Sequence, residues 1–425
     1  MTAVPAGSAT AAEEVRAEVR SWLAQHWDPD APLAEWRSAL VESGWACPTW
    51  PVDLYGRGLP PELARVATDE VRAAGAVGPA IGVGMSLAAP TLLEHARPDL
   101  ARPLLHGIAT GADTWCQLFS EPGNGSDLAG VTTHAHRDGD EWVVTGQKLW
   151  TTGAHHAAYG MLLARTDADV PKHRGLSYFA FPMRQPGVEV RSLRQMNGRA
   201  SFNEVFIDEA RVPHAHLVGQ LHDGWRVALS TLSHERGLAA GLFGALPPAG
   251  EGRTRTEARA EAEGYLETYE WYPQRAGRAD LVAPLAQRLG RSADPVLRQE
   301  IAALHALRRV AEVTAQRAAE ARRAGRPGPE GSVGKLHASQ IARAAAGAHG
   351  RVSGAHAMLA GQESIEAGIV AEVLVSVPGQ SIAGGTDEIQ HNIVGERVLG
   401  LPKEPSVDTG IPFRDVRTNR SGPER

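Results

Sequence analysis

Residues 115 to 130 read Trp-Cys-Gln-Leu-Phe-Ser-Glu-Pro-Gly-Asn-Gly-Ser-Asp-Leu-Ala-Gly. An apolar-rich run over 115–119 stops at a polar turn that contains Gly123 and Gly125. These glycines permit positive φ and let backbone amides approach a ligand closely. The stretch therefore predicts a strand that ends in a tight loop of free amides, to which Ser126 adds a hydroxyl.

A second β-rich stretch follows, Glu-Trp-Val-Val-Thr-Gly-Gln-Lys-Leu-Trp-Thr-Thr over 141–152. We expect its break at Gly146 and Gln147 to form a hairpin. Trp150 and Thr152 lie two residues apart and therefore share one face of a strand. A flat indole and a hydroxyl beside free amides suit a large planar cofactor with a charged tail. A buried tryptophan beside an ordinary β-turn explains the pattern equally well.

The actual residues resemble three ordered motifs of the acyl-CoA dehydrogenase family, which binds FAD. The motifs are Gln-Leu-Phe-Ser-Glu-Pro-Gly-Asn-Gly-Ser-Asp over 117–127, Gly-Gln-Lys-Leu-Trp-Thr-Thr-Gly over 146–153, and Ile-Ala-Gly-Gly-Thr-Asp-Glu-Ile-Gln over 382–390. This resemblance covers nearly the whole chain. It implies an N-terminal helical domain, a middle β domain and a C-terminal helical bundle, an α+β multidomain fold.

The resemblance also assigns residues to an FAD site. It places Gln117, Phe119 and Ser120 along the isoalloxazine ring, and Gly125 with Ser126 at the pyrophosphate. It places Trp150 over one face of the flavin and Thr152 within hydrogen-bonding reach of N5. At the N-terminus of the last predicted helix, Thr386 and Glu388 are expected to contact the distal half of the cofactor.

Dehydrogenation of an acyl thioester needs a base for the α-proton, donors for the thioester oxygen and a flavin that accepts hydride. Many family members carry the catalytic glutamate directly before the Gly-Thr of the C-terminal motif, where this chain has Gly384. A minority carry it in a Glu-Arg pair on an earlier helix, which matches Glu235 and Arg236. We expect Glu235 to be the base, with Arg236 and the Gly384 amide contacting substrate. On spacing alone, Glu235 would instead be a surface helix residue.

One departure from the family concerns the ADP half of FAD. Family members usually supply an Arg-x-x-Phe-Gly and a Gln-x-x-Gly-Gly element from a neighbouring subunit, and residues 260–360 contain neither. Arg253, Arg255 and Arg259 could suit phosphates, although a solvated helix face explains them as well. We expect a homodimer or homotetramer, with a heteromer as the alternative.

Composition sets further bounds. The chain has 425 residues, of which 43% are hydrophobic, which suits two or three domains with sizeable cores. A formal charge of -6 argues against nucleic-acid binding. Cys47 and Cys116 are the only cysteines and no secretory leader is evident, which predicts a reduced cytoplasmic setting. The uncharged run 73–93 is interrupted by Gly and Pro, so we expect no membrane span. The histidines between 155 and 173 lack metal-ligand spacing, so no metal is expected.

Periodicity predicts the domain boundaries. We expect a helical domain over 1–113, a β domain over 114–222, a helical bundle over 223–402 and a tail over 403–425. The first ten residues are expected to be disordered, and the tail disordered or loosely docked. Predicted helices cover 12–27, 60–74, 88–95, 101–107, 224–243, 295–322, 334–360, 365–373 and 387–399.

The predicted function is therefore FAD-dependent oxidation of a saturated acyl-CoA, or another acyl thioester, to the trans-2-enoyl product. Electrons are expected to pass to an electron-transferring flavoprotein. Two alternatives stay open. One is a flavin oxidase or monooxygenase on the same fold, and the other is a non-catalytic or cofactor-sharing subunit of a heteromeric dehydrogenase. Length, branching and ring content of the acyl group are left open.

Overall fold

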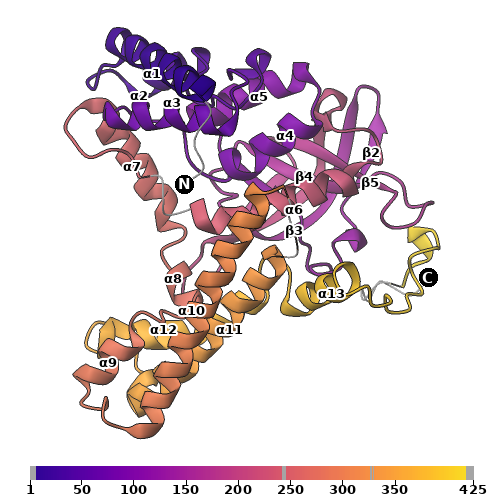
Figure 1. Ribbon diagram of the computed structural model, residues 1–425. Helices are drawn as coiled ribbons and strands as arrows, with labels where there is room; N and C mark the ends of the chain where they lie inside the picture. The colour runs from indigo at the N-terminus through magenta and orange to yellow at the C-terminus, as the bar shows by residue number, and fades with distance from the viewer. Residues whose placement is uncertain (1–5, 242–245, 326–327, 329, 418–425) are drawn as a thin grey trace. The chain divides into compact units, whose positions relative to one another are not determined.

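The computed structural model describes residues 6–241, 246–325, 328 and 330–417. Helices come first, then a β-sheet, then helices again (Figure 1), which confirms the predicted fold class. Contacts group the chain into two compact units. The first comprises Met1–Leu193, Ser201–Thr268 and Val407–Arg425, and the second comprises Arg194–Ala200 and Tyr269–Ser406. The domain boundaries predicted from sequence stay a prediction.

The N-terminal helices form around an apolar core. In α1 (Ala6–His26) Val15, Val19 and Leu23 lie four residues apart on one face and are buried. The helix begins at Ala6, so the disorder predicted through residue 10 is wrong over its last five positions. The remaining helices are α2 (Leu33–Glu42), α3 (Pro61–Ala73), α4 (Ala89–His95) and α5 (Pro98–Thr110), with a 3-10 turn at Val52–Leu54 and a π turn at Gly84–Ala88.

The sheet has the strand order β6-β7-β3-β2-β4-β5-β8, and β1 pairs in parallel with β4. The strands β6 and β8 were not predicted; β6 packs Val188 and Val190 only partly buried against the core of the sheet, and β8 is only two residues long. Their bounds are β1 Trp115–Leu118, β2 His134–Asp138, β3 Glu141–Thr152, β4 Tyr159–Arg165, β5 Leu176–Pro182, β6 Val188–Leu193, β7 Phe202–Pro213 and β8 Leu217–Val218.

The hairpin predicted at Gly146 is wrong. Strand β3 continues through this position and pairs with β7, and the hairpin turn lies instead between β2 and β3, where Gly139 has a φ of 60°. Gly146 is needed for another reason, since a Cβ there would lie 2.3 Å from the Thr133 hydroxyl oxygen. The glycine marks a close approach of two chain segments at a register shift, not a turn.

Two helices follow the sheet within the first unit, α6 (Gly224–Gly241) and α7 (Arg253–Glu267). The α7 helix packs on α2. There the buried Arg37 side chain donates to Glu261 at 2.6 Å, and the buried Thr254 hydroxyl donates to the carbonyl of Ala31 at 2.6 Å. The charged segment around α7 is therefore anchored, not simply solvated.

In the second unit, α10 and α11 lie side by side (Figure 1). Its core contains Leu285, Leu297, Leu304 and Val370. The predicted helix over 334–360 ends at Ser353 and continues as a 3-10 turn. The helices are α8 (Tyr272–Arg275), α9 (Val282–Arg288), α10 (Pro295–Arg323), α11 (Glu330–Ser353), α12 (Ile369–Ser376) and α13 (Asp387–Arg397), with 3-10 turns at Gly354–Met358, Ile365–Gly368 and Val377–Ser381.

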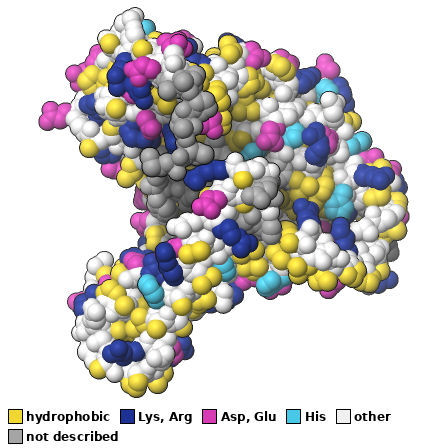
Figure 2. Space-filling view, in the orientation of Figure 1, with side chains coloured by type: hydrophobic (Ala, Val, Ile, Leu, Met, Phe, Trp, Pro, Cys, Tyr) yellow, Lys and Arg dark blue, Asp and Glu magenta, His cyan; other side chains and the backbone are white. Residues whose placement is uncertain are grey.

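No helix in the described ranges is both long enough and apolar enough to cross a membrane. On the face of the molecule in Figure 2, basic and acidic side chains are interspersed among hydrophobic ones.

Candidate active site

The ends of β1 and β3 meet, and they carry two of the motifs singled out in the sequence. The amide of Leu149 donates to the carbonyl of Ser120 at 2.8 Å, and Lys148 Nζ donates to the carbonyl of Phe119 at 3.1 Å. Gln117 and Ser120 are half-buried, whereas Phe119 is buried and packs edge-on against Tyr178. The structure thus brings the residues predicted to line a flavin ring next to the strand that carries Trp150 and Thr152.

A buried ion pair holds this junction from within. Lys148 and Glu121 are 0% and 3% exposed, and their charged atoms lie 3.1 Å apart. The carboxylate also accepts from the amides of Thr132 and Thr133 at 2.7 and 2.8 Å. Burial alone would raise the pKa of Glu121, but the charge of Lys148 and these hydrogen bonds outweigh it and lower the pKa to about 2. We did not predict this pair; the only signal was one lysine in a β-rich run.

Trp150 has an unusual backbone. Its φ is 60°, and it lies at the register shift between Lys148 and Thr151. A positive φ is uncommon for a residue with a large side chain and occurs often at functional sites. The side chain is 54% exposed and contacts Phe202 edge-on, while Thr151 is buried and Thr152 half-buried. The bulge therefore presents an indole to the surface of the first unit.

The loop after β1 is open. Gly123, Gly125 and Ser126 are exposed, and a Cβ built on either glycine would meet nothing within 4 Å. Neither glycine has a positive φ, so that expected reason for their presence is wrong. Among the described residues, no hydrogen bond engages the amides of Gly125 and Ser126. The glycines keep these amides accessible because they carry no side chain.

Helix α6 carries Glu235 toward β1. The hydroxyl of Tyr178 on β5 lies 3.0 Å from that of Thr231, which ties α6 to the sheet one helical turn before Glu235. The Glu235 carboxylate is half-buried and lies 3.5 Å from Gln117 Nε2, at the long limit for a hydrogen bond. Glu235 is therefore not a fully exposed surface residue. Arg236 follows in α6, and its side chain lies outside the described part of the structure.

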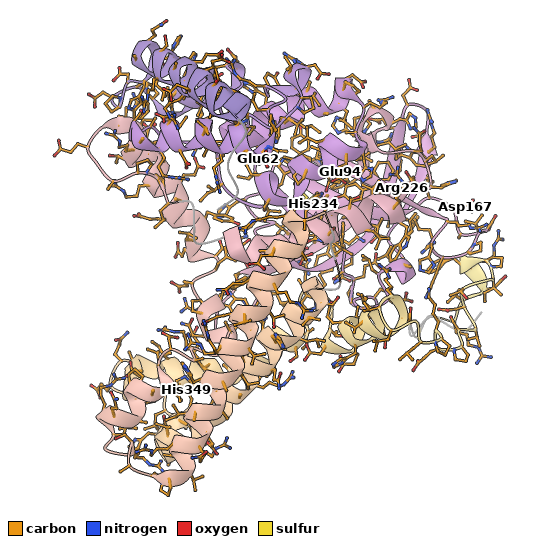
Figure 3. All side chains as sticks on the ribbon, viewed as in Figure 1. Glu62, Glu94, Asp167, Arg226, His234 and His349 are labelled. Atoms are coloured by element: carbon orange, nitrogen blue, oxygen red, sulfur yellow. The ribbon has the colours of Figure 1, made fainter. Side chains whose placement is uncertain are left out.

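Two polar contacts lie along α6. His234 Nε2 lies 3.0 Å from a carboxylate oxygen of Glu94 on α4, and Arg226 in the first turn pairs with Asp223, the residue before the helix. Figure 3 shows Glu94, His234 and Arg226 along these two helices.

Three predicted residues lie in the second unit. Gly384 is exposed with a φ of 67°, and its carbonyl accepts from Gln390. Thr386 caps α13, since its hydroxyl accepts from the amide of Ile389 at 3.2 Å. Glu388 is exposed in the first turn of that helix. All three residues therefore lie at or next to the N-terminus of α13.

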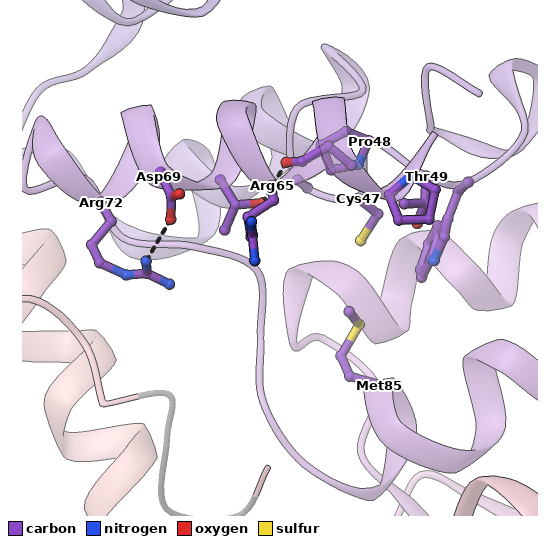
Figure 4. Close-up of a pocket in the computed structure, with 12 residues that line it drawn as sticks. Cys47, Pro48, Thr49, Arg65, Asp69, Arg72 and Met85 are labelled. Carbon is purple, nitrogen blue, oxygen red and sulfur yellow. Dashed lines mark hydrogen bonds and ion pairs between the residues drawn. The ribbon is translucent and has the colours of Figure 1, made fainter. Parts of the chain in front are cut away.

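An open cavity of about 500 Å³ lies elsewhere in the first unit, between the 46–50 loop and α3. Figure 4 shows Cys47, Arg65 and Met85 among the residues that line it. Burial raises the pKa of the Cys47 thiol to about 12, which makes it unreactive near neutral pH. No predicted site residue lines this cavity. Within the described ranges, no cluster of three or more His, Cys, Asp or Glu residues is placed to hold a metal ion.

The residues at the β1–β3 junction fit FAD. An exposed indole suits the face of a planar ring, and amides and a hydroxyl in an open loop suit a pyrophosphate. A carboxylate 3.5 Å from Gln117 then lies beside the residues expected to line the ring. The arrangement combines an exposed indole with a half-buried carboxylate, a candidate base.

Comparison with known proteins gives three family matches. They are the acyl-CoA dehydrogenase N-terminal domain over residues 7–112, the middle domain over 116–210 and the C-terminal domain over 283–399. Acyl-CoA dehydrogenase IpdE1 of Mycobacterium tuberculosis is 34% identical over 413 residues, covering 92% of this chain and 98% of IpdE1. Acyl-CoA dehydrogenase FadE34 of the same organism is 36% identical, covering 86% of this chain and 46% of FadE34, so this chain spans about half of FadE34.

Two solved structures are also similar. The Tcur3481-Tcur3483 steroid ACAD is 25% identical with a TM-score of 0.63, covering 93% of this chain and 98% of that one. The ChsE4-ChsE5 complex from Mycobacterium tuberculosis is 26% identical with a TM-score of 0.59, covering 95% and 99%.

Proposed function

The chain belongs to the acyl-CoA dehydrogenase family of oxidoreductases, and on this premise we propose that it binds FAD at the ends of β1 and β3 and converts a saturated acyl thioester to its trans-2-enoyl product. The observation that carries the proposal is the half-buried Glu235 carboxylate 3.5 Å from Gln117, a residue of the β1 motif. When bound, FAD supplies a two-electron acceptor for the hydride from the β-carbon.

The chain's own residues perform the other tasks. Glu235 accepts the α-proton, and its half-buried position beside Gln117 supports this role. The Gly384 amide donates to the thioester oxygen, which acidifies that proton. Arg236 contributes to substrate binding beside the base. Electrons then leave to an electron-transferring flavoprotein; oxygen consumption during turnover would instead indicate an oxidase or monooxygenase.

The residues that contact the cofactor can be assigned to its parts in the same way. Gln117, Phe119 and Ser120 would hold the ring, and Trp150 and Thr152 would contact it from β3. Gly125 and Ser126 would bind the pyrophosphate through backbone amides and a hydroxyl. Thr386 and Glu388 would bind toward the distal half of the cofactor.

The substitution Glu235→Gln tests the base. We expect turnover to fall by about two to four orders of magnitude, because the base is lost while size and shape are kept. Flavin absorbance per chain and the melting temperature should stay at wild-type values. Glu62→Gln is the matched control, since Glu62 is an exposed glutamate on α3. Near-wild-type dehydrogenation by the Glu235 variant on any good substrate would show that another group is the base.

For the acyl group we propose a bulky, ring-containing thioester. The support is the likeness to a solved steroid ACAD that covers 93% of this chain. Turnover should be measured on straight-chain, branched and polycyclic acyl-CoAs in parallel. Preference for straight chains by tenfold or more in kcat/KM would refute the proposal.

A second candidate function is a cofactor-sharing subunit of a heteromer. It is favoured by the missing ADP-binding elements between 260 and 360 and by the likeness to the ChsE4-ChsE5 complex. The discriminating experiment is flavin content and turnover of the chain expressed alone and together with a homologous chain.

A further inference from the structure

The C-terminal residues 407–417, called the strap below, dock on the segment 165–172 after β4. The amides of Phe413 and Arg414 donate to the carbonyls of Val170 and Ala168 at 2.9 and 3.0 Å. Pro412 forms a β-bridge with Pro171. The strap therefore adds an ordered edge to this connection, although the tail was expected to be disordered or loosely docked.

Under the strap lie two buried cations, Arg165 and Lys172, which are 4% and 7% exposed. Arg165 donates to the carbonyls of Ala129 and Val131 at 2.6 and 3.2 Å. Lys172 Nζ donates to both carboxylate oxygens of Asp127, at 2.9 and 3.0 Å. Both cations thus hold residues 127–131, which directly follow Ser126 of the open loop.

The strap completes the environment of both cations. The ring of Phe413 stacks on Arg165, with 3.3 Å between the guanidinium carbon and the ring centroid. A carboxylate oxygen of Asp408 lies 2.7 Å from Lys172 Nζ. These contacts help to cover the two cations, and hydrogen bonds from buried donors are stronger than those from exposed ones. A third contact, between Arg414 and Asp169, is exposed and reaches neither cation.

We propose that Asp408 and Phe413 are positioning residues for the pyrophosphate loop, acting through Lys172 and Arg165. The strap holds residues 127–131 in place and thereby presents the Gly125 and Ser126 amides in a fixed geometry. The loop then loses less conformational entropy when an anion binds. This inference rests on the proposed assignment of that loop to FAD.

The test uses the full-length chain with Phe413→Ala and Asp408→Asn, and Arg414→Gln as the matched control. The first measurement is hydrogen–deuterium exchange of amides 125–131 without added FAD. The second is the dissociation constant of FAD, followed by flavin fluorescence. We expect each of the first two variants to speed exchange and weaken FAD binding by about tenfold, the size of one lost desolvated cation–π contact or charged hydrogen bond.

Two comparisons separate positioning from general stability. Phe413→Tyr and Asp408→Glu should restore slow exchange and FAD affinity. Val19→Ala, in the buried core of α1, should lower the melting temperature without changing exchange at 125–131. Wild-type exchange and affinity in both strap variants, or equal effects from Arg414→Gln, would overturn the inference. A wild-type chain that takes up no FAD would defeat the proposed function instead, and the exchange measurement would still decide whether the strap orders the loop.

Discussion

At the scale of single residues, the pair of Glu121 and Lys148 links the two motifs that define the candidate site. Removing one partner leaves a charge with no exposed surface, which typically costs about 3–5 kcal/mol. We therefore expect Glu121→Gln to lower the free energy of unfolding by that amount in urea titrations. Glu189→Gln is the control, because its ion pair with Arg191 is exposed and solvent screens such pairs strongly. Equal effects in the two variants would contradict the role given to burial.

The same carboxylate predicts a dependence of stability on pH. The pKa of Glu121 is about 2 in the folded chain against an ordinary value of 4.5. Because the folded pKa is the lower one, the stabilisation is complete above the unfolded pKa and disappears as the pH falls through about 2. The difference in unfolding free energy between wild type and Glu121→Gln should thus be constant above pH 5.5 or so and shrink below it. A difference that stays constant down to pH 3 or so would show that Glu121 titrates normally.

The family motifs predicted Gln117, Ser126 and Trp150 as cofactor contacts, and this assignment stays a prediction. The sequence did not identify Lys172 or Arg165 as supports of the loop. Their partners include Asp408 and Phe413, and Asp408 is 236 positions from Lys172 along the chain. No local pattern encodes a contact across that distance.

At the scale of elements, two glycines show that the same residue type can be required at different positions for different reasons. A Cβ on Gly146 would lie 2.6 Å from the Thr133 backbone, whereas one on Gly125 would meet nothing within 4 Å. Gly146→Ala should therefore destabilise the sheet by about 1–3 kcal/mol, as overpacking does. Gly125→Ala should leave unfolding unchanged, and any effect should appear in FAD affinity. Similar destabilisation in both variants would mean that the sheet does not constrain Gly146.

Helix α7 shows that a pattern of charged residues does not reveal which groups those residues contact. Its composition predicted either phosphate-binding arginines or a solvated face. Instead Glu257 accepts from the Leu33 amide across 224 residues of sequence, and Arg255 donates to the Gly75 carbonyl. The helices predicted from apolar stripes, such as α1, were correct because burial periodicity is local. The docking of α7 was not predicted, because its partners lie in the N-terminal helices.

At the scale of the whole molecule, the order of helices, sheet and helices could be predicted from the sequence, and the family matches agree with it. The assembly of subunits could not be predicted, because this chain lacks the sequence elements with which the family usually binds the ADP half of FAD. The arginines offered as substitutes are already engaged: Arg253 pairs with Glu257, Arg255 reaches Gly75, and Arg259 donates to the Gly250 carbonyl.

These contacts lead to a prediction about subunit composition. An adenosine diphosphate half left in water would forfeit much of the binding energy of FAD, and α7 would have to break its own contacts to cover it. We therefore expect the chain expressed alone to form at least a dimer but to hold clearly less than one FAD per chain. Co-expression with a homologous chain that carries the missing elements should raise flavin content toward one per site. Light scattering combined with flavin absorbance gives both quantities in one sample. A monomer with full flavin occupancy would exclude subunit-shared binding, because everything FAD needs would then come from a single chain.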